Sequence, residues 1–176
     1  MLLIVVNWLY LIAPPKEKFM RKIIVVFLGV AVLWSVALGR STSETFALAD
    51  RVGEGNERSF FVLSTSAGGY VIRHDGMGEF TSPAGLRRVF MLRVGAKGRI
   101  DRVYYLEHQR DLFLMYEVHD ASSQWTYLVR MEQTKRKARW VIEVDGVGLG
   151  APVIHGEMIV IKDTQISAAN GAVRQD

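Results

Sequence analysis

The sequence of 176 residues contains no cysteine. Without a thiol, the chain cannot be held by disulfides, use a cysteine nucleophile or bind a metal through cysteine ligands. A lipoprotein-type anchor is excluded as well, because its lipid is attached to a cysteine. Lysine is scarce after residue 39, where fourteen arginines stand against four lysines. Because arginine forms bidentate contacts and tolerates interfaces better than lysine, this composition favours a protein-docking surface.

Outside its first segment, the sequence also lacks an excess of one charge. The net charge is +4, but residues 1–39 carry four basic groups and one acidic group. Residues 40–176 therefore carry 18 basic and 17 acidic groups and are close to neutral. Long-range attraction of a polyanion requires a larger positive excess. The charge balance predicts no nucleic-acid partner for the main part of the chain.

An uncharged apolar run extends from Ile23 to Gly39, directly after Arg21 and Lys22. Seventeen helical residues rise roughly 25 Å, slightly less than the hydrocarbon core of about 30 Å. Extension of the helix back to Phe19 closes this difference, and the two basic side chains can reach the lipid headgroups. The pattern predicts a transmembrane helix over residues 19–39, with the anchor residues Phe19, Arg21, Lys22, Ile23, Phe27, Gly29, Trp34 and Gly39.

A cleaved secretory signal is the alternative interpretation of this run. From Met20 onward it has a basic start, an apolar centre and small residues at its end, and both 37–39 and 47–49 fit a small-x-small cleavage pattern. Either interpretation gives the same orientation, because the basic residues cluster before the run and Arg40 alone follows it. The positive-inside rule then predicts an inner-membrane location, with a cytoplasmic N-terminus and a periplasmic C-terminal domain.

The segment before the anchor, residues 1–18, combines an apolar stretch with a basic cytoplasmic loop. Residues 1–13 are too few to span a bilayer comfortably. They form a short first span, an interfacial segment with Trp8 and Tyr10 at the headgroups, or the product of a start codon placed too early. An interfacial or partly inserted segment is preferred.

The polar residues 40–58 after the anchor predict a juxtamembrane linker, with a short helical turn around Glu44 to Asp50. A β-rich extracytoplasmic domain is expected over residues 59–163. The small and polar residues 164–176 predict a flexible tail.

Short alternating or β-branched runs, separated by Gly, Asp and Ser, predict an all-β domain from residue 59 onward. The apolar run Leu112–Tyr116 predicts a central strand that is buried on both faces. Turn residues such as Asp75-Gly76 and Asp145-Gly146 separate the runs. Strands are expected near Phe60–Thr65, Tyr70–His74, Arg88–Val94, Arg102–Glu107, Leu112–His119, Trp125–Met131, Arg139–Val144 and Glu157–Lys162.

Two similar stretches suggest an internal repeat. Residues 70–78 read YVIRHDGMG and residues 140–148 read WVIEVDGVG. Each stretch is preceded by a predicted strand and turn, and is followed by Pro83 or Pro152 and a further apolar strand. We interpret the pair as a duplication of strand, turn, aromatic-led strand, Asp-Gly turn, proline and strand.

The segment ARWVIEVDGVGLGAPVIHGEMIVI resembles the blade-to-blade junction of quinoprotein-type β-propellers. In that family an aromatic-led outer strand ends in a glycine turn, and a small-Pro-Val step begins the next inner strand. With the weaker copy YVIRHDGMGEFTSPAGLRRVFML, the resemblance covers about residues 60–95 and 124–162. The chain departs from the family because about 105 residues make two blades, whereas a closed ring needs about four or more. The expected fold is an antiparallel β-sandwich or partial propeller-like sheets, with the sandwich preferred over a fragment or a ring completed by partners.

The sequence contains no enzyme signature. The four histidines, His74, His108, His119 and His155, form no His-x-His or His-x-x-x-His pair. Ser64-Thr65-Ser66 lacks the context of a nucleophile elbow, and Gly146–Gly150 lacks the Lys-Ser/Thr of a phosphate loop. The spacing of the carboxylates identifies no catalytic pair. We therefore expect no enzyme, no cofactor and no small-molecule substrate.

One basic cluster, Lys135, Arg136, Lys137 and Arg139, lies between two predicted strands. It is interpreted as a solvated turn or as a hairpin tip that contacts lipid headgroups or an acidic partner surface. The expected function is that of a non-catalytic membrane-anchored accessory or scaffolding subunit, whose partners are the lipid bilayer and other subunits of a membrane complex, such as a respiratory or photosynthetic one. The alternatives are a periplasmic ligand-binding module, anchored or released, and, third, a hydrolase or metal enzyme.

Overall fold

The computed structural model describes residues 43–53, 59–95, 98–133 and 137–174. The chain divides into two compact units, Met1–Ser41 and Thr42–Asp176, and every described residue belongs to the second unit. The anchor predicted over residues 19–39 and the segment before it lie outside the described residues. Within the described ranges, no helix is long and apolar enough to cross a membrane.

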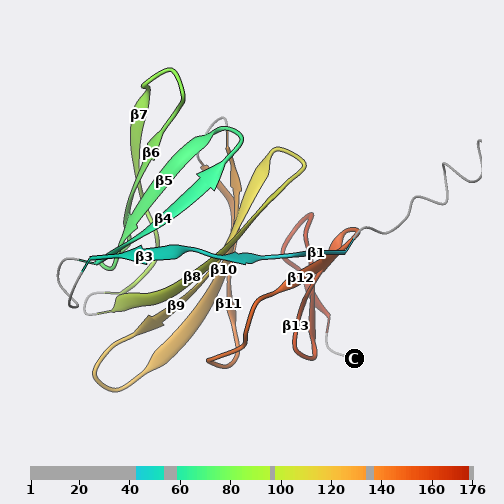
Figure 1. Cartoon of the computed structure of the whole chain (residues 1–176). Helices are drawn as coiled ribbons and strands as arrows, with labels where there is room; N and C mark the ends of the chain where they lie inside the picture. The colour runs from blue at the N-terminus through green and yellow to red at the C-terminus, as the bar shows by residue number, and fades with distance from the viewer. Residues whose placement is uncertain (1–42, 54–58, 96–97, 134–136, 175–176) are drawn as a thin grey trace, which may run out of the picture. The chain divides into compact units, whose positions relative to one another are not determined.

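The described part of the chain is all-β, as the sequence predicts, and its strands form three antiparallel sheets of five strands each (Figure 1). Sheet C consists of β3 (Asp50–Val52), β4 (Phe60–Thr65), β5 (Gly68–Arg73), β6 (Met77–Thr81) and β7 (Arg87–Met91). Sheet B consists of β2 (Ala47–Leu48), β8 (Arg99–His108), β9 (Asp111–His119), β10 (Gln124–Glu132) and β11 (Lys137–Val144). Sheet A consists of β1 (Ser43–Thr45), β12 (Val153–His155), β13 (Met158–Ile161), β14 (Thr164–Ser167) and β15 (Val173–Arg174).

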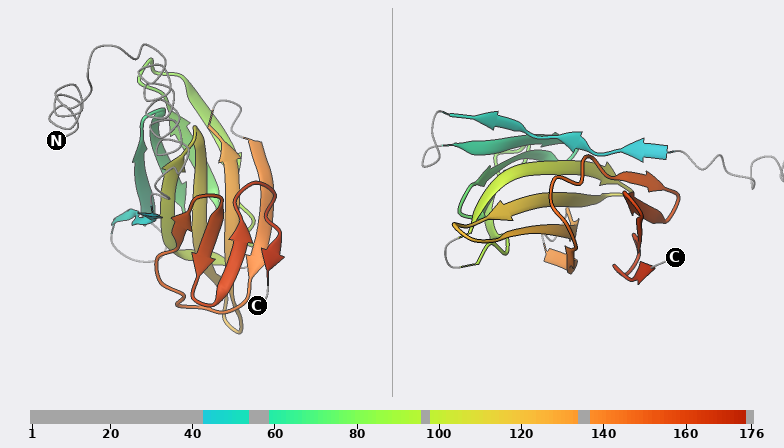
Figure 2. Two further views of the ribbon diagram at one scale, coloured as in Figure 1. Left: turned by 90° about the vertical axis from the view of Figure 1, so that its right-hand side faces the viewer. Right: turned by 90° about the horizontal axis from the view of Figure 1, so that it is seen from below.

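Four strands of each sheet follow one another in the chain, and the N-terminal segment 43–52 supplies the fifth. β1 pairs with β12, β2 with β8 and β3 with β4. Between these pairings, the amide of Phe46 donates to the carbonyl oxygen of Pro152 at 3.0 Å, and the amide of Ala49 donates to that of Val103 at 2.9 Å. One extended segment therefore runs along the first strands of all three sheets, as the cyan ribbon in Figure 2 shows.

This arrangement gives every sheet two kinds of edge. We call the edges of β4, β8 and β12 that pair with the N-terminal segment the capped edges. On the opposite sides, β7, β11 and β15 are the last strands of their sheets, and no described strand pairs with their outer edges. We call these the open edges. An open edge presents backbone N–H and C=O groups that a further strand can use.

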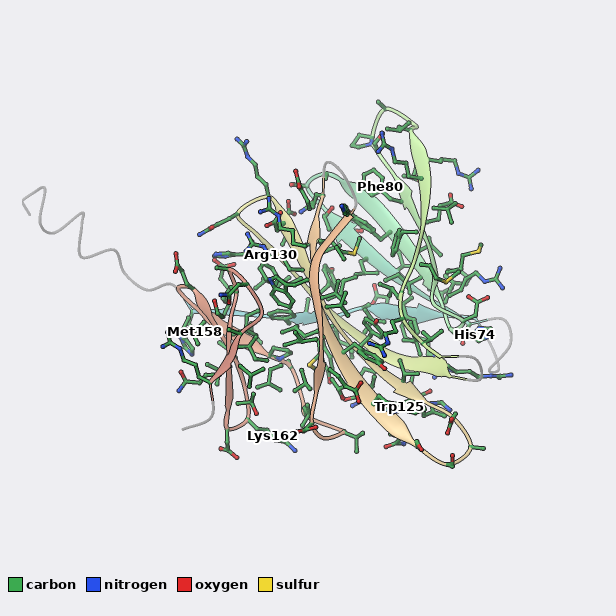
Figure 3. All side chains as sticks on the ribbon, turned by 180° about the vertical axis from the view of Figure 1, so that it is seen from behind. His74, Phe80, Trp125, Arg130, Met158 and Lys162 are labelled. Carbon is green, nitrogen blue, oxygen red and sulfur yellow. The ribbon has the colours of Figure 1, made fainter. Side chains whose placement is uncertain are left out.

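Sheet B is shared by two hydrophobic cores, because its side chains alternate between two covered faces. In β9, Leu112, Leu114, Tyr116 and Val118 belong to the core that sheet B forms with sheet C. Phe113 and Met115 of the same strand belong to the core that sheet B forms with sheet A. The prediction that this strand is buried on both faces is confirmed. Figure 3 shows the side chains between the sheets, with Phe80 of the first core labelled.

Most of the longer predicted strands are present, and β4 has the predicted bounds. β6 was not among the predicted strands, because the turn before it hides a strand of five residues. β12 begins directly after Pro152, where the propeller resemblance implies a strand. The helical turn expected around Glu44 to Asp50 is wrong, since this stretch forms β1, β2 and the start of β3. The loose tail expected from residue 164 instead contains β14 and β15, with Ile166 fully buried.

The proposed internal repeat does not have equivalent positions in the structure. Tyr70 begins the first stretch in β5, the third strand across sheet C, and the stretch continues through a turn into β6 of the same sheet. Trp140 begins the second stretch in β11, at an open edge, and the chain then crosses to β12 of another sheet. An aromatic residue, a Val-Ile pair and an Asp-Gly turn suit either place, so local similarity alone does not define a repeat.

Candidate docking site

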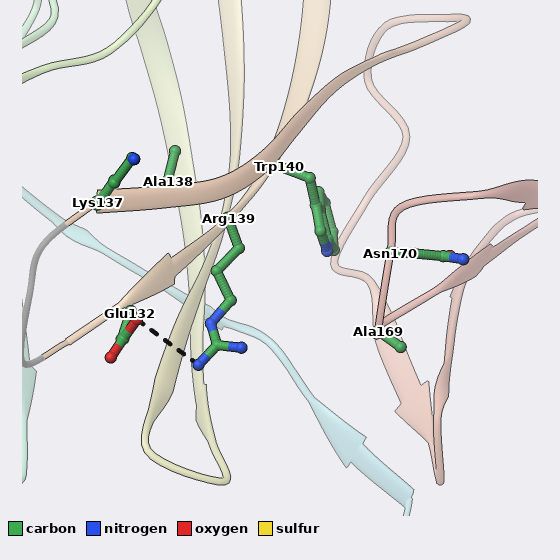
Figure 4. Close-up of a pocket in the computed structure, with 7 residues that line it drawn as sticks. All are labelled: Glu132, Lys137, Ala138, Arg139, Trp140, Ala169 and Asn170. Carbon is green, nitrogen blue, oxygen red and sulfur yellow. Dashed lines mark ion pairs between the residues drawn. The ribbon is translucent and has the colours of Figure 1, made fainter.

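A groove of about 620 Å³ lies beside the open edge of sheet B (Figure 4). One wall comes from the end of β10 and the start of β11, and the other from the loop between β14 and β15. The groove brings two basic side chains, one carboxylate and an indole ring around one space. Its lining residues are Glu132, Lys137, Ala138, Arg139, Trp140, Ala169 and Asn170.

A buried ion pair lies next to the groove and contacts two of its lining residues, Arg139 and Ala169. Asp111, at the start of β9, is 3% exposed. Its Oδ2 accepts a hydrogen bond from Nε of Arg130 at 2.6 Å and also lies 2.5 Å from Nη2 of the same side chain. Nη1 of Arg130 donates to the carbonyl oxygen of Ala168 at 2.7 Å, and the guanidinium carbon lies 5.5 Å from the centroid of the Phe113 ring. Because a buried charge is costly without its partner, this pair holds the β14–β15 loop in a defined place against sheet B.

Trp140 forms the aromatic wall of the groove. Its Nε1 donates to the same carbonyl oxygen of Ala168 at 3.3 Å, and its ring lies 6.0 Å from that of Phe113. Gly171 permits this approach: a Cβ on Gly171, whose φ is +74°, would lie 3.1 Å from the indole. The ring is therefore positioned by the loop rather than by the sheet alone.

Arg139 is an accessible cation of the groove. Its Nη2 lies 3.7 Å from Glu132 Oε2 and its Nε lies 3.5 Å from Asp111 Oδ2, both longer than a tight charge-assisted hydrogen bond. The Arg139 side chain is 48% exposed. Such loose pairs contribute little to stability, so Arg139 can exchange them for a carboxylate of a partner at low cost.

Two of the four residues in the predicted basic cluster, Lys137 and Arg139, line this groove. Lys135 and Arg136 lie outside the described residues. The contribution of Asp111 and Arg130 was not predicted, since nineteen positions separate them. The sequence signal for it is a carboxylate directly before the apolar run Leu112–Tyr116, which implies that its charge is paired when the strand is buried.

The histidines do not converge on one site. His108 Nδ1 lies 3.4 Å from Glu44 Oε2, and His119 Nδ1 lies 2.9 Å from Asp101 Oδ2. These ion pairs lie at opposite ends of the β8–β9 hairpin. In the strand register, His108 lies opposite Asp111 at the turn, and His119 lies opposite Arg99 at the other end. His74 lines a small space with His119, while His155 is exposed on β12. The described residues contain no group of three His, Asp or Glu side chains that could hold a metal ion.

Ser66 and Glu107 connect the β4–β5 turn to the end of β8. The Ser66 amide donates to Glu107 Oε2 at 2.7 Å, and its hydroxyl donates to Oε1 of the same carboxylate. Partial burial raises the pKa of Glu107, but the hydrogen bonds from Ser66 outweigh it, and the net pKa lies below the ordinary value. Glu107 is thus held as an anion, and the Ser66 hydroxyl is engaged as a donor to it.

No protein-family model, no curated protein and no solved structure matches this chain. The arrangement in hand offers a preformed groove with an accessible arginine, a lysine and an indole, held by a buried ion pair. This combination suits recognition of a carboxylate-bearing surface.

Proposed function

We propose that the chain is a non-catalytic, membrane-anchored accessory or scaffolding subunit of a larger membrane complex, and that its periplasmic β domain docks on partner subunits. The observation that carries this proposal is the groove lined by Lys137, Arg139 and Trp140, which lies beside the buried Asp111–Arg130 ion pair. Arginine and tryptophan are the side chains that contribute most often to binding energy at protein interfaces.

The geometry favours an acidic protein surface as the partner of this groove. A partner carboxylate that enters it can pair with Arg139 while its neighbouring apolar group covers the Trp140 ring. The loop carbonyl that fixes the ring is itself held by Arg130, so little ordering is required on binding. A preorganised site of this kind loses less conformational entropy than a mobile loop would.

The connectivity supports partial propeller-like sheets as the finer description of the fold. Each of the three sheets contains a meander of four consecutive strands, and successive sheets pack face to face. Trp140 lies within β11, the last strand of sheet B, and the Ala151-Pro152-Val153 step enters β12 of sheet A. This is the order of the propeller junction that the sequence resembles. Three meanders fall short of the four or so blades of the smallest closed rings.

A periplasmic ligand-binding module is the second candidate, and the size of the groove favours it. A volume of about 620 Å³ lies within the range of roughly 300–1,000 Å³ found for small-molecule sites. This function predicts a monomer that binds a soluble ligand, whereas the first predicts a stable heteromeric complex.

The test is purification of the tagged full-length protein in a gentle detergent, with composition measured by native mass spectrometry. A stoichiometric complex supports docking, and a free monomer contradicts it. Arg139→Glu should reduce the recovered partner severalfold, while Lys162→Glu, an exposed charge reversal at the β13–β14 turn, serves as the matched control. Equal recovery of partner with the Arg139 variant would show that this groove is not the docking site.

A further inference from the structure

The open edge of sheet C has no further strand within the part of the chain that the structure describes, and its hydrogen-bonding groups can be assigned. The amide of Leu92 donates to Gly76 and that of Ser82 donates to Leu86, both at 2.9 Å, so the even-numbered residues of β7 bond to β6. In an antiparallel pair the alternate residues direct their N–H and C=O to the other side. The backbone groups of Arg87, Val89 and Met91 therefore face outward.

β7 itself is firmly attached to the sheet, so this edge is a rigid template. Phe90 lies across Gly78, where a Cβ would come within 2.1 Å of the ring. The Phe90 ring also packs against buried Tyr70 at 6.1 Å. Val89 and Met91 point to the opposite face and are 66% and 68% exposed. A strand that is anchored through one face and bare along its edge is suited to pairing with a further strand.

An apolar slot lies beside this edge. It has a volume of about 190 Å³, and the residues that line it are Phe90, Met91, Leu92, Arg93, Tyr116, Val129, Met131, Ala138 and Val141. Its lining joins the end of β7 to the face of β9, β10 and β11 in sheet B. Val141 of β11 remains 42% exposed there. The volume is below the roughly 300 Å³ of small-molecule sites, which suits a few side chains of a peptide rather than a cofactor.

The charges along β7 indicate what kind of strand fits. Arg87 and Arg88 begin the strand, one on each face, since successive side chains alternate. Arg87 is paired with Glu79, while no ion pair involves Arg88 or Arg93 within the described residues. Glu143 lies two residues after Val141 on β11, on the same face of sheet B, and is close to Tyr127. The edge is thus basic at its start and apolar toward Met91.

We propose that β7 accepts an extended segment of a partner protein as a sixth, antiparallel strand of sheet C. The segment is apolar where it lies opposite Val89 and Met91, and it carries carboxylates where it lies opposite Arg87 and Arg88. Its backbone pairs with the outward groups of β7, and its side chain opposite Phe90, which is also apolar, enters the slot and covers Val141. Strand addition of this kind gives affinity through the main chain and specificity through the pockets. The proposal rests on the docking function above and names a second contact for it.

The direct test uses full-length protein in detergent and the synthetic peptide acetyl-Thr-Val-Ile-Val-Glu-Glu-amide, which places its acidic end opposite Arg87 and Arg88 when antiparallel. Hydrogen exchange measured by mass spectrometry should show slower exchange in residues 87–91 when the peptide is added. The same peptide with lysines in place of both glutamates should bind several times more weakly. Absence of protection, equal binding of both peptides, or an edge already protected without peptide would overturn the proposal.

Val89→Pro is the discriminating variant, because it removes an outward N–H and leaves the bonds to β6 intact. It should weaken peptide binding by about tenfold or more, through the lost hydrogen bond and the ring's clash with the incoming strand. Val141→Glu should also weaken it by placing a charge in the slot. Val147→Glu is its matched control, since Val147 is similarly exposed at 44% but lies outside the slot.

The two proposals can fail separately. If partner subunits copurify equally with Val89→Pro and with the unaltered protein, docking stands and strand addition at β7 is wrong. If the peptide protects β7 but no subunit copurifies with the full-length chain, the β7 site stands and the accessory-subunit function is wrong.

Discussion

The capped and open edges of the three sheets differ in whether a further strand pairs with them. β12, part of β4 and a short stretch of β8 pair with one segment of the same chain. The outer edges of β7, β11 and β15 have no strand partner among the described residues. The difference shows that this chain uses its own N-terminal segment to block one set of edges and presents the other set to its surroundings.

The N-terminal segment limits strand pairing at one set of edges. Its consecutive short strands reach all three sheets, so without that segment the chain would expose three further templates for strand pairing. The open edges carry different protection. β7 begins with two arginines, and β11 begins with Lys137 and carries Arg139. Charge at an open edge limits pairing to partners that can neutralise it.

The largest effect is expected from breaking the cap at its centre. Phe46 is 3% exposed, packs against Phe113 with ring centroids 6.4 Å apart, and belongs to the core between sheets B and A. Phe46→Ala should lower the free energy of unfolding by about 3–5 kcal/mol, through lost burial and the cavity that remains. Urea denaturation followed by intrinsic fluorescence measures this loss. Leu48→Ala in the same segment is the control and should change stability by less than about 0.5 kcal/mol, because Leu48 is exposed.

A proline substitution at a capped edge and one at an open edge should lower the free energy of unfolding by different amounts, both smaller than the effect of Phe46→Ala. Ala49→Pro removes the amide that donates to Val103, leaves a buried carbonyl without its donor and should cost about 1–3 kcal/mol. Val89→Pro removes an amide that has no strand partner, and we expect a cost below about 1 kcal/mol. The same denaturation assay compares them. Equal losses of stability would mean that the β7 edge is paired in the protein after all.

The smallest effect concerns the side-chain link between two capped strands. Because hydrogen bonds from Ser66 lower the pKa of Glu107 in the folded state, ionised Glu107 stabilises the fold above the ordinary glutamate pKa of about 4.3. That contribution is lost as the pH falls through the lowered folded pKa. Glu107→Gln should therefore reduce stability at pH 7 by less than about 1 kcal/mol, given its exposure. The difference from the unaltered protein should shrink as the pH falls below the ordinary glutamate pKa, and a difference that does not shrink would contradict this origin.

Long strands were predictable because they contain enough residues to display a pattern. β4 alternates Phe61 and Leu63 inward with more polar or less buried neighbours, and its bounds match the prediction. The run Leu112–Tyr116 implies burial on both sides, and sheet B does lie between two cores. In both cases the signal is hydrophobic periodicity, which reports directly on covered faces.

Short strands were not predictable, because two or three residues show no period. β1, β2 and β3 each satisfy only a few backbone groups, and what makes them strands is the neighbouring edge rather than their own composition. The docking groove likewise depends partly on neighbouring strands that the local sequence does not reveal. Lys137 and Arg139 follow from a visible cluster, while the Asp111–Arg130 pair arises from register between β9 and β10.

The burial of β9 on both faces has a consequence for how the domain comes apart. Leu114 and Met115 are neighbours in sequence yet belong to different cores. Separation of either outer sheet would expose one side of the strand that the other core depends on. We therefore expect the two cores to melt together, in a single cooperative transition, although the domain consists of three separate sheets.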